Sequence, residues 1–259
     1  MIKKRNNKLW YQLNGLLRRS IVTNQFGLFN KHVTINEYPK SGGTWLTNMV
    51  SEILDYNYPR DRLPNLSKCM MHGHYVNVNS INNQIIMYRD GRDVMVSQYY
   101  HFLVPWDNGK NKYDVSFYRK KFQFDDYMDI ETNMSKFIEM TSNKDIYKFS
   151  WGEFVDRWKP NEYIAYTKYE LLKMNPFLEL VNICNALKIK VEEEKIHKII
   201  KKYDFKSLKK EKKSSGGFLR KGIVGDWKNI FSKEARNTFS SLYGKQLISL
   251  GYEKDDNWI

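Results

Sequence analysis

The chain has 259 residues, of which 41% are hydrophobic and 28% charged, so it has the composition of an ordinary folded protein with a sizeable core. The net charge of +14 at pH 7 indicates an anionic partner, which could be nucleic acid, an anionic surface or a small polyanion. The sequence contains no apolar stretch as long as a transmembrane helix. The basic segment 1–19 predicts an amphipathic helix and lacks the apolar core of a signal peptide, so we expect a cytoplasmic protein.

The first half of the chain alternates between strands and helices. Residues 33–38 predict a strand, and the one-sided apolar pattern of residues 44–54 predicts a helix. Residues 84–88 predict a second buried strand, followed by another helical pattern from Val94. Strand, turn and helix thus occur twice, as in a mainly parallel sheet with crossover helices. We predict an α/β fold, a P-loop-like central parallel sheet flanked by helices, in a single domain over residues 1–259.

The second half of the chain predicts one more strand, at 162–167, and several helices. Residues 103–130 are polar, aromatic and irregular, which favours a loop or lid over core structure. Residues 214–228 form a basic loop flanked by glycines. The helical patterns lie at about 132–141, 151–158, 176–187, 191–202 and 233–250.

The stretch YPKSGGTW, residues 38–45, joins the first strand to its helix through a glycine turn. Backbone N–H groups and the positive end of the helix dipole meet there, and Lys40 adds a formal charge, so the turn suits a phosphate or sulfate. A kinase-type phosphate loop would place its lysine after the glycines and needs a magnesium ligand, for which the sequence offers no clear acidic strand end. The turn alone therefore predicts an anion site without naming the anion.

Two further basic elements suggest a second anion site. Arg89 ends the second strand and provides a planar fork for a phosphate, and Ser97, eight residues on, adds a hydroxyl donor. Arg220-Lys221-Gly222 can close over the same anion. A nucleotide with phosphates at two separate positions needs two such sites.

These three motifs together resemble the cytosolic type of sulfotransferase, which uses 3′-phosphoadenosine 5′-phosphosulfate (PAPS). That family's first motif reads YPKSGTTW, and its second places a serine eight residues after an arginine, as residues 89–102 do. Its third motif, RKGxxGDWKNxF, matches residues 220–231 throughout. The chain departs from the first motif at Gly43, where the family has threonine.

The resemblance implies a role for each motif residue. The 5′-phosphosulfate would be held by Lys40, Ser41, Gly42, Gly43 and Thr44, and the 3′-phosphate by Arg89, Ser97, Arg220, Lys221 and Gly222. Trp45 would stack on the adenine, with Tyr169 and Phe205 near the base. No metal is implied, because the protein cations neutralise the developing charge. Residues 103–130 would line the acceptor, and 214–228 would close over the nucleotide.

The family also places a catalytic histidine just after a short strand. Here the matching stretch is Met70-Met71-His72-Gly73-His74, and the lysine that usually precedes the histidine is missing. We prefer His72 as the base over His74, since it fits the strand end better. His72 would remove the proton of the acceptor hydroxyl, and Lys40 would stabilise the leaving phosphate.

Two other functions are kept as alternatives: a basic nucleic-acid-binding protein, which the charge alone would explain, and a nucleotide-dependent kinase. The acceptor can be a small molecule, such as a phenol, alcohol or amine, or a glycan. We expect no nucleic-acid partner, and no segment of the sequence identifies an oligomer interface.

Overall fold

A four-stranded parallel sheet lies at the centre of the computed structural model, which describes residues 8–23, 31–60, 68–81, 83–106, 109, 112–160, 165–204 and 222–259. The sheet order is β2-β1-β3-β4, and every neighbouring pair is parallel. The strands are β1 (His32–Glu37), β2 (Cys69–Gly73), β3 (Gln84–Tyr88) and β4 (Ala165–Lys168). The predicted α/β fold with a central parallel sheet is confirmed.

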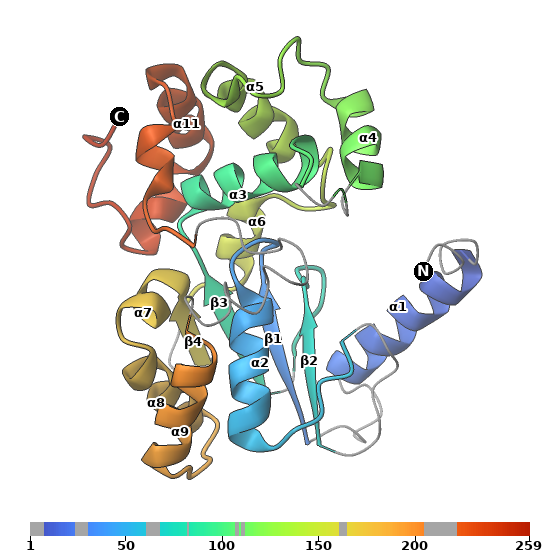
Figure 1. Cartoon of the computed structure of the whole chain (residues 1–259), viewed down its shortest axis with the longest axis vertical. Coiled ribbons are helices and arrows are strands. Elements are labelled where there is room, and N and C mark those ends of the chain that lie inside the picture. Colours follow the sequence, from blue (N-terminus) through green and yellow to red (C-terminus); the bar gives the residue numbers. More distant parts are fainter. Residues whose placement is uncertain are drawn as a thin grey trace.

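Helices cover both faces of this sheet (Figure 1). One face packs against α2 (Gly43–Leu54), α7 (Tyr169–Met174), α8 (Pro176–Ala186) and α9 (Glu193–Lys202). The other packs against α3 (Gly91–Leu103), α5 (Ile130–Ser142), α6 (Trp151–Arg157) and α11 (Lys233–Ser249), with the 3₁₀ turn η2 (Asp226–Asn229) beside them. Helix α1 (Lys8–Val22) lies near the β2 edge. No helix in these described segments is long and apolar enough to cross a membrane.

The alternation of side chains along β1 decides what lies beneath α2. Val33 and Ile35 are buried in the core cluster that includes Leu46 of α2. Since successive strand residues point to opposite faces, Glu37 continues the same inward row. In β2, Met70 belongs to that cluster too, which places His72 on the same face. The sequence thus brings a carboxylate and an imidazole together under the N-terminus of α2.

The helix and strand predictions hold with one correction. Helices α5, α6, α8, α9 and α11 lie within two residues of the predicted ranges, and the third strand is β4. The irregular structure predicted for 103–130 is wrong in its middle, where α4 (Lys112–Lys121) forms. Val115, Tyr118 and Phe122 recur at helical spacing, Val115 and Phe122 are buried, and Tyr118 packs on Phe102 of α3 with ring centroids 4.2 Å apart.

Candidate active site

The candidate site lies where the carboxyl ends of the parallel strands meet. The loop of residues 38–42 follows β1, His72 and His74 lie at the end of β2, Arg89 follows β3, and Tyr169 follows β4. Parallel strands bring their carboxyl ends to one edge of the sheet, which is where open α/β folds bind their ligands. Segments that are far apart in the sequence therefore converge on the glycine turn.

Two residues of the turn have left-handed backbones. Gly42 has φ of 102°, and a Cβ added there would lie 2.8 Å from the Tyr169 ring, so only glycine fits. Lys40 has φ of 79°, a conformation that costs a non-glycine residue about 1–3 kcal/mol and that clusters at functional sites. Helix α2 begins directly after this turn, at Gly43. A tight turn that leads directly into a helix N-terminus is the backbone geometry on which the predicted anion site depends. We refer to residues 40–44 as the cradle.

Two buried polar atoms at the cradle fit an anionic ligand. The Ser41 hydroxyl and Nε of Arg89 are both buried, and neither has a hydrogen-bond partner among the residues that the structure describes. Buried donors are normally paired, so each is suited to bond a ligand oxygen. The Arg89 guanidinium is itself held in place: Nη1 donates to the Lys40 carbonyl at 3.1 Å, and the group lies 4.4 Å from the Tyr169 ring centroid.

An aromatic wall adjoins the cradle. Trp45 meets Tyr169 edge to face, with ring centroids 5.9 Å apart, and its Nε1 donates to the Tyr203 carbonyl at 3.0 Å. Both rings are fixed by packing at the start of α2 and α7. A planar base can stack beside such rings, in keeping with the sequence prediction for Trp45 and Tyr169.

The segment after Gly222 is tied to α3 by a buried carboxylate. Asp93 accepts hydrogen bonds from the backbone N–H of Gly225 at 2.7 Å and of Trp227 at 3.0 Å. Burial raises the pKa of Asp93 above its usual range, although Arg89 and these N–H groups oppose that shift. Arg92 stacks on Trp227 at 3.8 Å and pairs with Asp90 at 2.7 Å. Asp93 and Arg92 thus brace this segment against α3.

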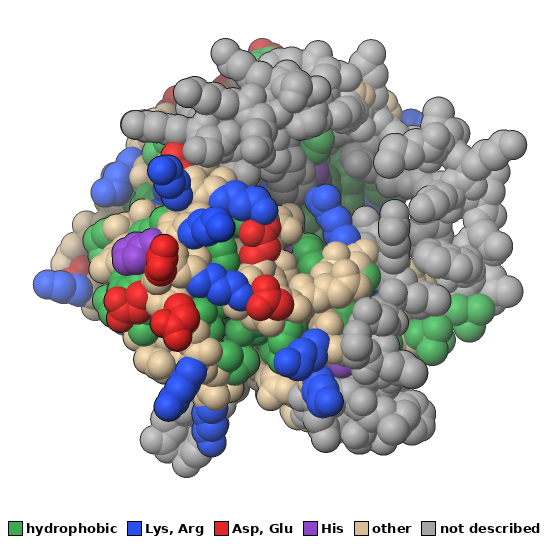
Figure 2. All heavy atoms as spheres, turned by 60° about the horizontal axis from the view of Figure 1, so that its bottom comes forward, with side chains coloured by type: hydrophobic (Ala, Val, Ile, Leu, Met, Phe, Trp, Pro, Cys, Tyr) green, Lys and Arg blue, Asp and Glu red, His purple; other side chains and the backbone are tan. Residues whose placement is uncertain are grey.

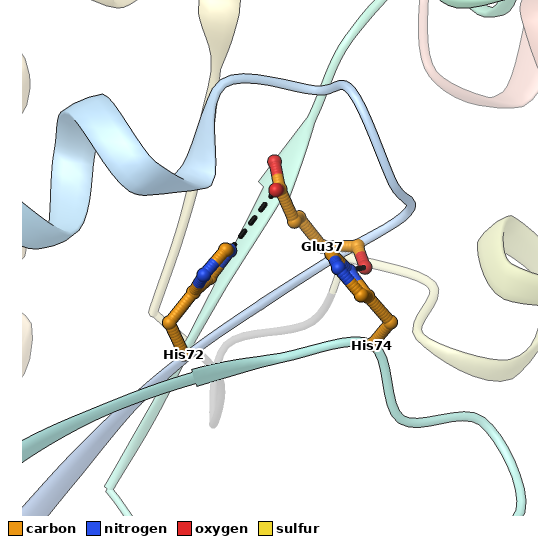
Figure 3. A group of neighbouring side chains, drawn as sticks. All are labelled: Glu37, His72 and His74. Atoms are coloured by element: carbon orange, nitrogen blue, oxygen red, sulfur yellow. Dashed lines mark hydrogen bonds and ion pairs between the residues drawn. The ribbon is translucent and has the colours of Figure 1, made fainter. Parts of the chain in front are cut away.

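Glu37 holds the two histidines at the end of β2 (Figure 3). Nε2 of His72 donates to the Glu37 carboxylate at 3.0 Å, and Nδ1 of His74 donates to the Glu37 carbonyl oxygen at 2.9 Å. The second carboxylate oxygen of Glu37 accepts from the Gly43 backbone N–H at 2.5 Å. The Glu37 and His72 side chains are only 4% and 14% exposed, whereas His74 is exposed. The described residues give Nε2 of His74 no hydrogen bond, which leaves its lone pair available.

The charge states follow from these contacts. Burial acts to raise the pKa of Glu37, but the His72 hydrogen bond, the two histidine charges and the Gly43 N–H outweigh it, so the pKa is lowered and the carboxylate is ionised. Although the residue as a whole is exposed, desolvation lowers the pKa of His74, and the charges of His72 and Lys40 act in the same direction against the attraction of Glu37. His74 is therefore neutral at pH 7.

The same three residues form a group whose ligand-type atoms all lie within 4.8 Å of one another, so they could in principle hold a divalent cation. Their contacts are those of a hydrogen-bonded set, because His72 and His74 each donate one ring N–H to an oxygen of Glu37. These hydrogen bonds engage Nε2 of His72 and Nδ1 of His74 and leave Nε2 of His74 without a partner among the described residues.

Comparison with known proteins decides the family. A family model described as "Sulfotransferase domain" matches residues 30–251. This chain belongs to the sulfotransferase domain family. Mouse sulfotransferase 1B1 is 25% identical to it, over 83% of this chain and 82% of that protein. Mouse sulfotransferase 1 family member D1 is 28% identical, over 83% of each.

Solved sulfotransferase structures share the fold. Mouse sulfotransferase SULT7A1 complexed with PAP aligns with a TM-score of 0.63 at 19% identity, covering 91% of this chain and 90% of that one. Retinol dehydratase in complex with androsterone and the inactive cofactor PAP aligns with a TM-score of 0.60 at 16% identity, covering 88% and 85%. The resemblance drawn from the motifs is confirmed at the level of the family.

The structure brings together most of the residues that the sequence assigned to the sulfotransferase site. Described residues at the strand ends or on the adjoining helices α2, α3 and α7 are Lys40, Ser41, Gly42, Gly43, Thr44, Trp45, His72, Arg89, Ser97 and Tyr169. Gly222 begins the last described segment, with φ of 62°, and Phe205, Arg220 and Lys221 lie outside the described residues. The Gly43 backbone N–H, expected to face the donor, is engaged by Glu37.

Sequence reasoning missed Glu37. Its signal was present, since an acidic residue continues the inward row of Val33 and Ile35 in a strand that is buried throughout. A buried carboxylate requires partners, and such a position points to a histidine or a cation nearby. The partner, His72, is 35 residues away in sequence and became visible only with the strand register, in which Ile35 pairs with His72.

Proposed function

We propose that this chain moves the sulfuryl group of PAPS to a hydroxyl or amine acceptor and releases adenosine 3′,5′-bisphosphate. The observation that carries the proposal is the cradle at residues 40–44, with the unpaired buried donors of Ser41 and Arg89 beside it. Membership of the sulfotransferase family supports it. So do the similar structures of mouse SULT7A1 and retinol dehydratase, both of which are complexes with PAP.

The chain's own residues divide the work of binding. Lys40, Ser41, Gly42 and Thr44 face the 5′-phosphosulfate, and Arg89, Ser97 and Arg220-Lys221-Gly222 face the 3′-phosphate. Trp45, Tyr169 and Phe205 flank the adenine. When bound, the donor supplies an activated sulfuryl group with the bisphosphate as its leaving group. Lys40 stabilises the negative charge that develops at the cradle, with no reorganisation during the reaction.

The base is one of two histidines, and the geometry favours His74 over the His72 that the sequence favoured. Nε2 of His72 is engaged by Glu37, whereas Nε2 of His74 carries a lone pair and Nδ1–H is fixed on a carbonyl. The charge of Lys40 also helps to lower the pKa of His74, which favours the neutral ring that a base requires. His74 accepts the acceptor's proton at Nε2, and the nearby Glu37 carboxylate stabilises the imidazolium that results.

His74→Ala and His72→Ala test the proposal together. The assay follows transfer of radiolabelled sulfate from PAPS to phenols, alcohols, amines and oligosaccharides, with bisphosphate binding measured by calorimetry. We expect His74→Ala to lower kcat by about 10²–10⁴-fold, the usual contribution of a general base. Bisphosphate affinity should change by less than about threefold, because neither histidine faces the nucleotide phosphates in this proposal.

Three outcomes would change the assignment. If His72→Ala alone loses this activity, the base is His72, as the sequence predicted. If both variants keep full activity, the histidine base is wrong. Absence of transfer by the wild-type protein to every acceptor class would refute the sulfotransferase proposal itself.

The finer points rest on family resemblance. We propose a small-molecule acceptor over a glycan, since the similar retinol dehydratase structures hold a small molecule, androsterone or retinol, together with PAP. The acceptor would lie against the segment 103–130, in which α4 packs on α3. We further propose a cytoplasmic enzyme without a nucleic-acid partner, in which the basic charge serves an anionic nucleotide.

A further inference from the structure

The backbone of Gly43 is helical and does not itself require glycine. Glycine is required there because no space is left for a side chain. A Cβ built on Gly43 would lie 2.5 Å from Cδ of Glu37 and 2.7 Å from Nε2 of His72. Real Cβ atoms essentially never approach other atoms so closely. The threonine of the family motif therefore cannot stand at this position while Glu37 and His72 keep their places.

The departure at Gly43 and the presence of Glu37 thus belong to one arrangement. The Glu37 side chain lies beneath α2, and His72 of the neighbouring strand β2 contacts it there. Gly43 has no side chain and so leaves space for both. The carboxylate is buried, and its bonds to the Gly43 N–H and to His72 offset the cost of removing it from water. The absence of a side chain at position 43 is therefore what allows the Glu37 carboxylate and the His72 ring to meet there.

We propose that Glu37 is the positioning residue of sulfuryl transfer in this chain, fixing His72 with its carboxylate and His74 with its carbonyl, and that Gly43 is glycine to admit it. This proposal rests on the sulfotransferase function proposed above. Glu37 orients the His74 ring, because a carbonyl can only accept, so Nδ1 must carry the proton and Nε2 must be the basic atom. Its charge also acts to raise the pKa of His74.

Glu37 has a cost at the anion cradle. Its carboxylate occupies the first backbone N–H of α2, which would otherwise face the donor, and it places a negative charge below an anionic ligand. The charge can therefore assist the proton transfer while opposing binding of the nucleotide. A positioning role therefore predicts that loss of the Glu37 charge slows transfer without weakening nucleotide binding, whereas a purely structural role predicts weaker binding.

Several charged and titratable groups lie around Glu37, His72 and His74 and bear on the pH dependence of the reaction. From the loop after β1, Lys40 acts on His74. From α1, Nη2 of Arg18 lies 3.5 Å from the His72 carbonyl. The charge of Glu37 also helps to raise the pKa of Tyr147. Of these groups, Glu37 is the one whose charge raises the pKa of His74 the most.

Glu37→Gln is the central variant, because it keeps the side chain's size and removes its charge. We expect kcat to fall at least about tenfold, a part of what a positioned base contributes. The acid limb of kcat/KM should move to lower pH, because His74 loses the anion that raises its pKa. The bisphosphate dissociation constant should stay equal or decrease. Glu131→Gln, on the exposed first turn of α5, is the control of equal charge change and should alter none of the three.

Unchanged kcat and pH profile in Glu37→Gln would overturn the positioning role while the wild-type transfer assay still upheld the sulfotransferase function. Weaker bisphosphate binding with unchanged kcat would make Glu37 a structural part of the cradle. Bisphosphate binding also shows that the variant is folded. If wild-type protein transfers no sulfuryl group, the proposed function fails, whatever the variants do.

A double-mutant cycle tests the spatial half of the proposal. Gly43→Ala should lower the melting temperature and weaken bisphosphate binding, because its Cβ meets Glu37 and His72. In a Glu37→Ala background the same change should cost much less, since the carboxylate is gone and His72 is free to turn aside. Equal losses of melting temperature and bisphosphate affinity in the two backgrounds would show that glycine at position 43 is not required by the Glu37 side chain.

Discussion

At the scale of single residues, Lys40 combines an unfavourable backbone with the charge that the proposed mechanism needs. Its φ of 79° costs a lysine about 1–3 kcal/mol. Stability and function are thus opposed at one position. Replacing the residue can separate the two, because glycine adopts the same backbone freely and has no charge.

Lys40→Gly should keep the unfolding free energy within about 1 kcal/mol of the wild-type value, since relief of strain and the greater freedom of the unfolded chain offset each other. Sulfuryl transfer should fall by about 10²–10³-fold, the usual cost of one preorganised charge-stabilising group. Urea unfolding and kcat measure the two effects. Lys188→Gly is the matched control, with φ of 57° at the end of α8, and it should leave kcat unchanged. A Lys40→Gly variant with wild-type kcat would remove Lys40 from the mechanism.

At the scale of elements, the segment that follows Gly222 depends on α3 for its position. Asp93 accepts two backbone N–H groups from this segment, and the partners, Gly225 and Trp227, stand at and next to the start of η2. These two hydrogen bonds connect α3 to the segment that contains η2. The packing of Arg92 on Trp227 reinforces the same junction.

Asp93→Ala should lower the unfolding free energy by about 2–4 kcal/mol, because it leaves two buried N–H groups without an acceptor. Bisphosphate affinity should fall as well, since the segment that follows Arg220-Lys221-Gly222 loses its anchor. Denaturant titration and calorimetry measure these effects. Asp125→Ala, at an exposed position, is the control and should shift stability by less than about 0.5 kcal/mol. Wild-type stability in Asp93→Ala would show that water replaces the carboxylate.

Local patterns determined most of the elements. Alternation in β1 and one-sided apolar spacing in α2 are written in neighbouring residues, so both were predictable. Helix α4 was missed because its strongly basic last turn, Arg119-Lys120-Lys121, obscured the apolar spacing of Val115, Tyr118 and Phe122. That spacing is decisive only when α3 provides a surface to bury it.

The site divides in the same way. Lys40, Arg89 and Ser97 could be assigned from the sequence because each belongs to a contiguous motif, and their roles at the nucleotide stay predictions. Glu37 and the reason for Gly43 were not, since both depend on the pairing of β1 with β2 and on the approach of α2. The choice between His72 and His74 depends on hydrogen bonds across the same strand pair, which no spacing along one strand reveals.

At the scale of the whole molecule, the net charge of +14 must be reconciled with a nucleotide site. Lysines of α9 are paired with acidic residues of α2 and its end, Lys195 with Asp55 at 2.6 Å and Lys202 with Glu52 at 2.7 Å. On the face shown in Figure 2, basic side chains of the described residues alternate with acidic ones and do not form a continuous basic stripe. On this face, dispersed charge of this kind offers no track for a nucleic-acid backbone.

The charge distribution leads to a prediction about salt. Adenosine 3′,5′-bisphosphate binds at a defined cradle, so its affinity should fall by less than about tenfold between 50 and 200 mM salt. A protein that contacts 6–10 DNA phosphates loses about 10³–10⁵-fold over the same range. Calorimetry with the bisphosphate and with a duplex oligonucleotide, at about 50, 150 and 200 mM salt, measures both slopes. The Arg89→Ala variant serves as control and should lose the bisphosphate response while keeping any weak oligonucleotide binding. Saturable micromolar binding of the oligonucleotide at about 150 mM salt, with no bisphosphate response in the wild-type protein, would favour a nucleic-acid-binding protein over the transferase.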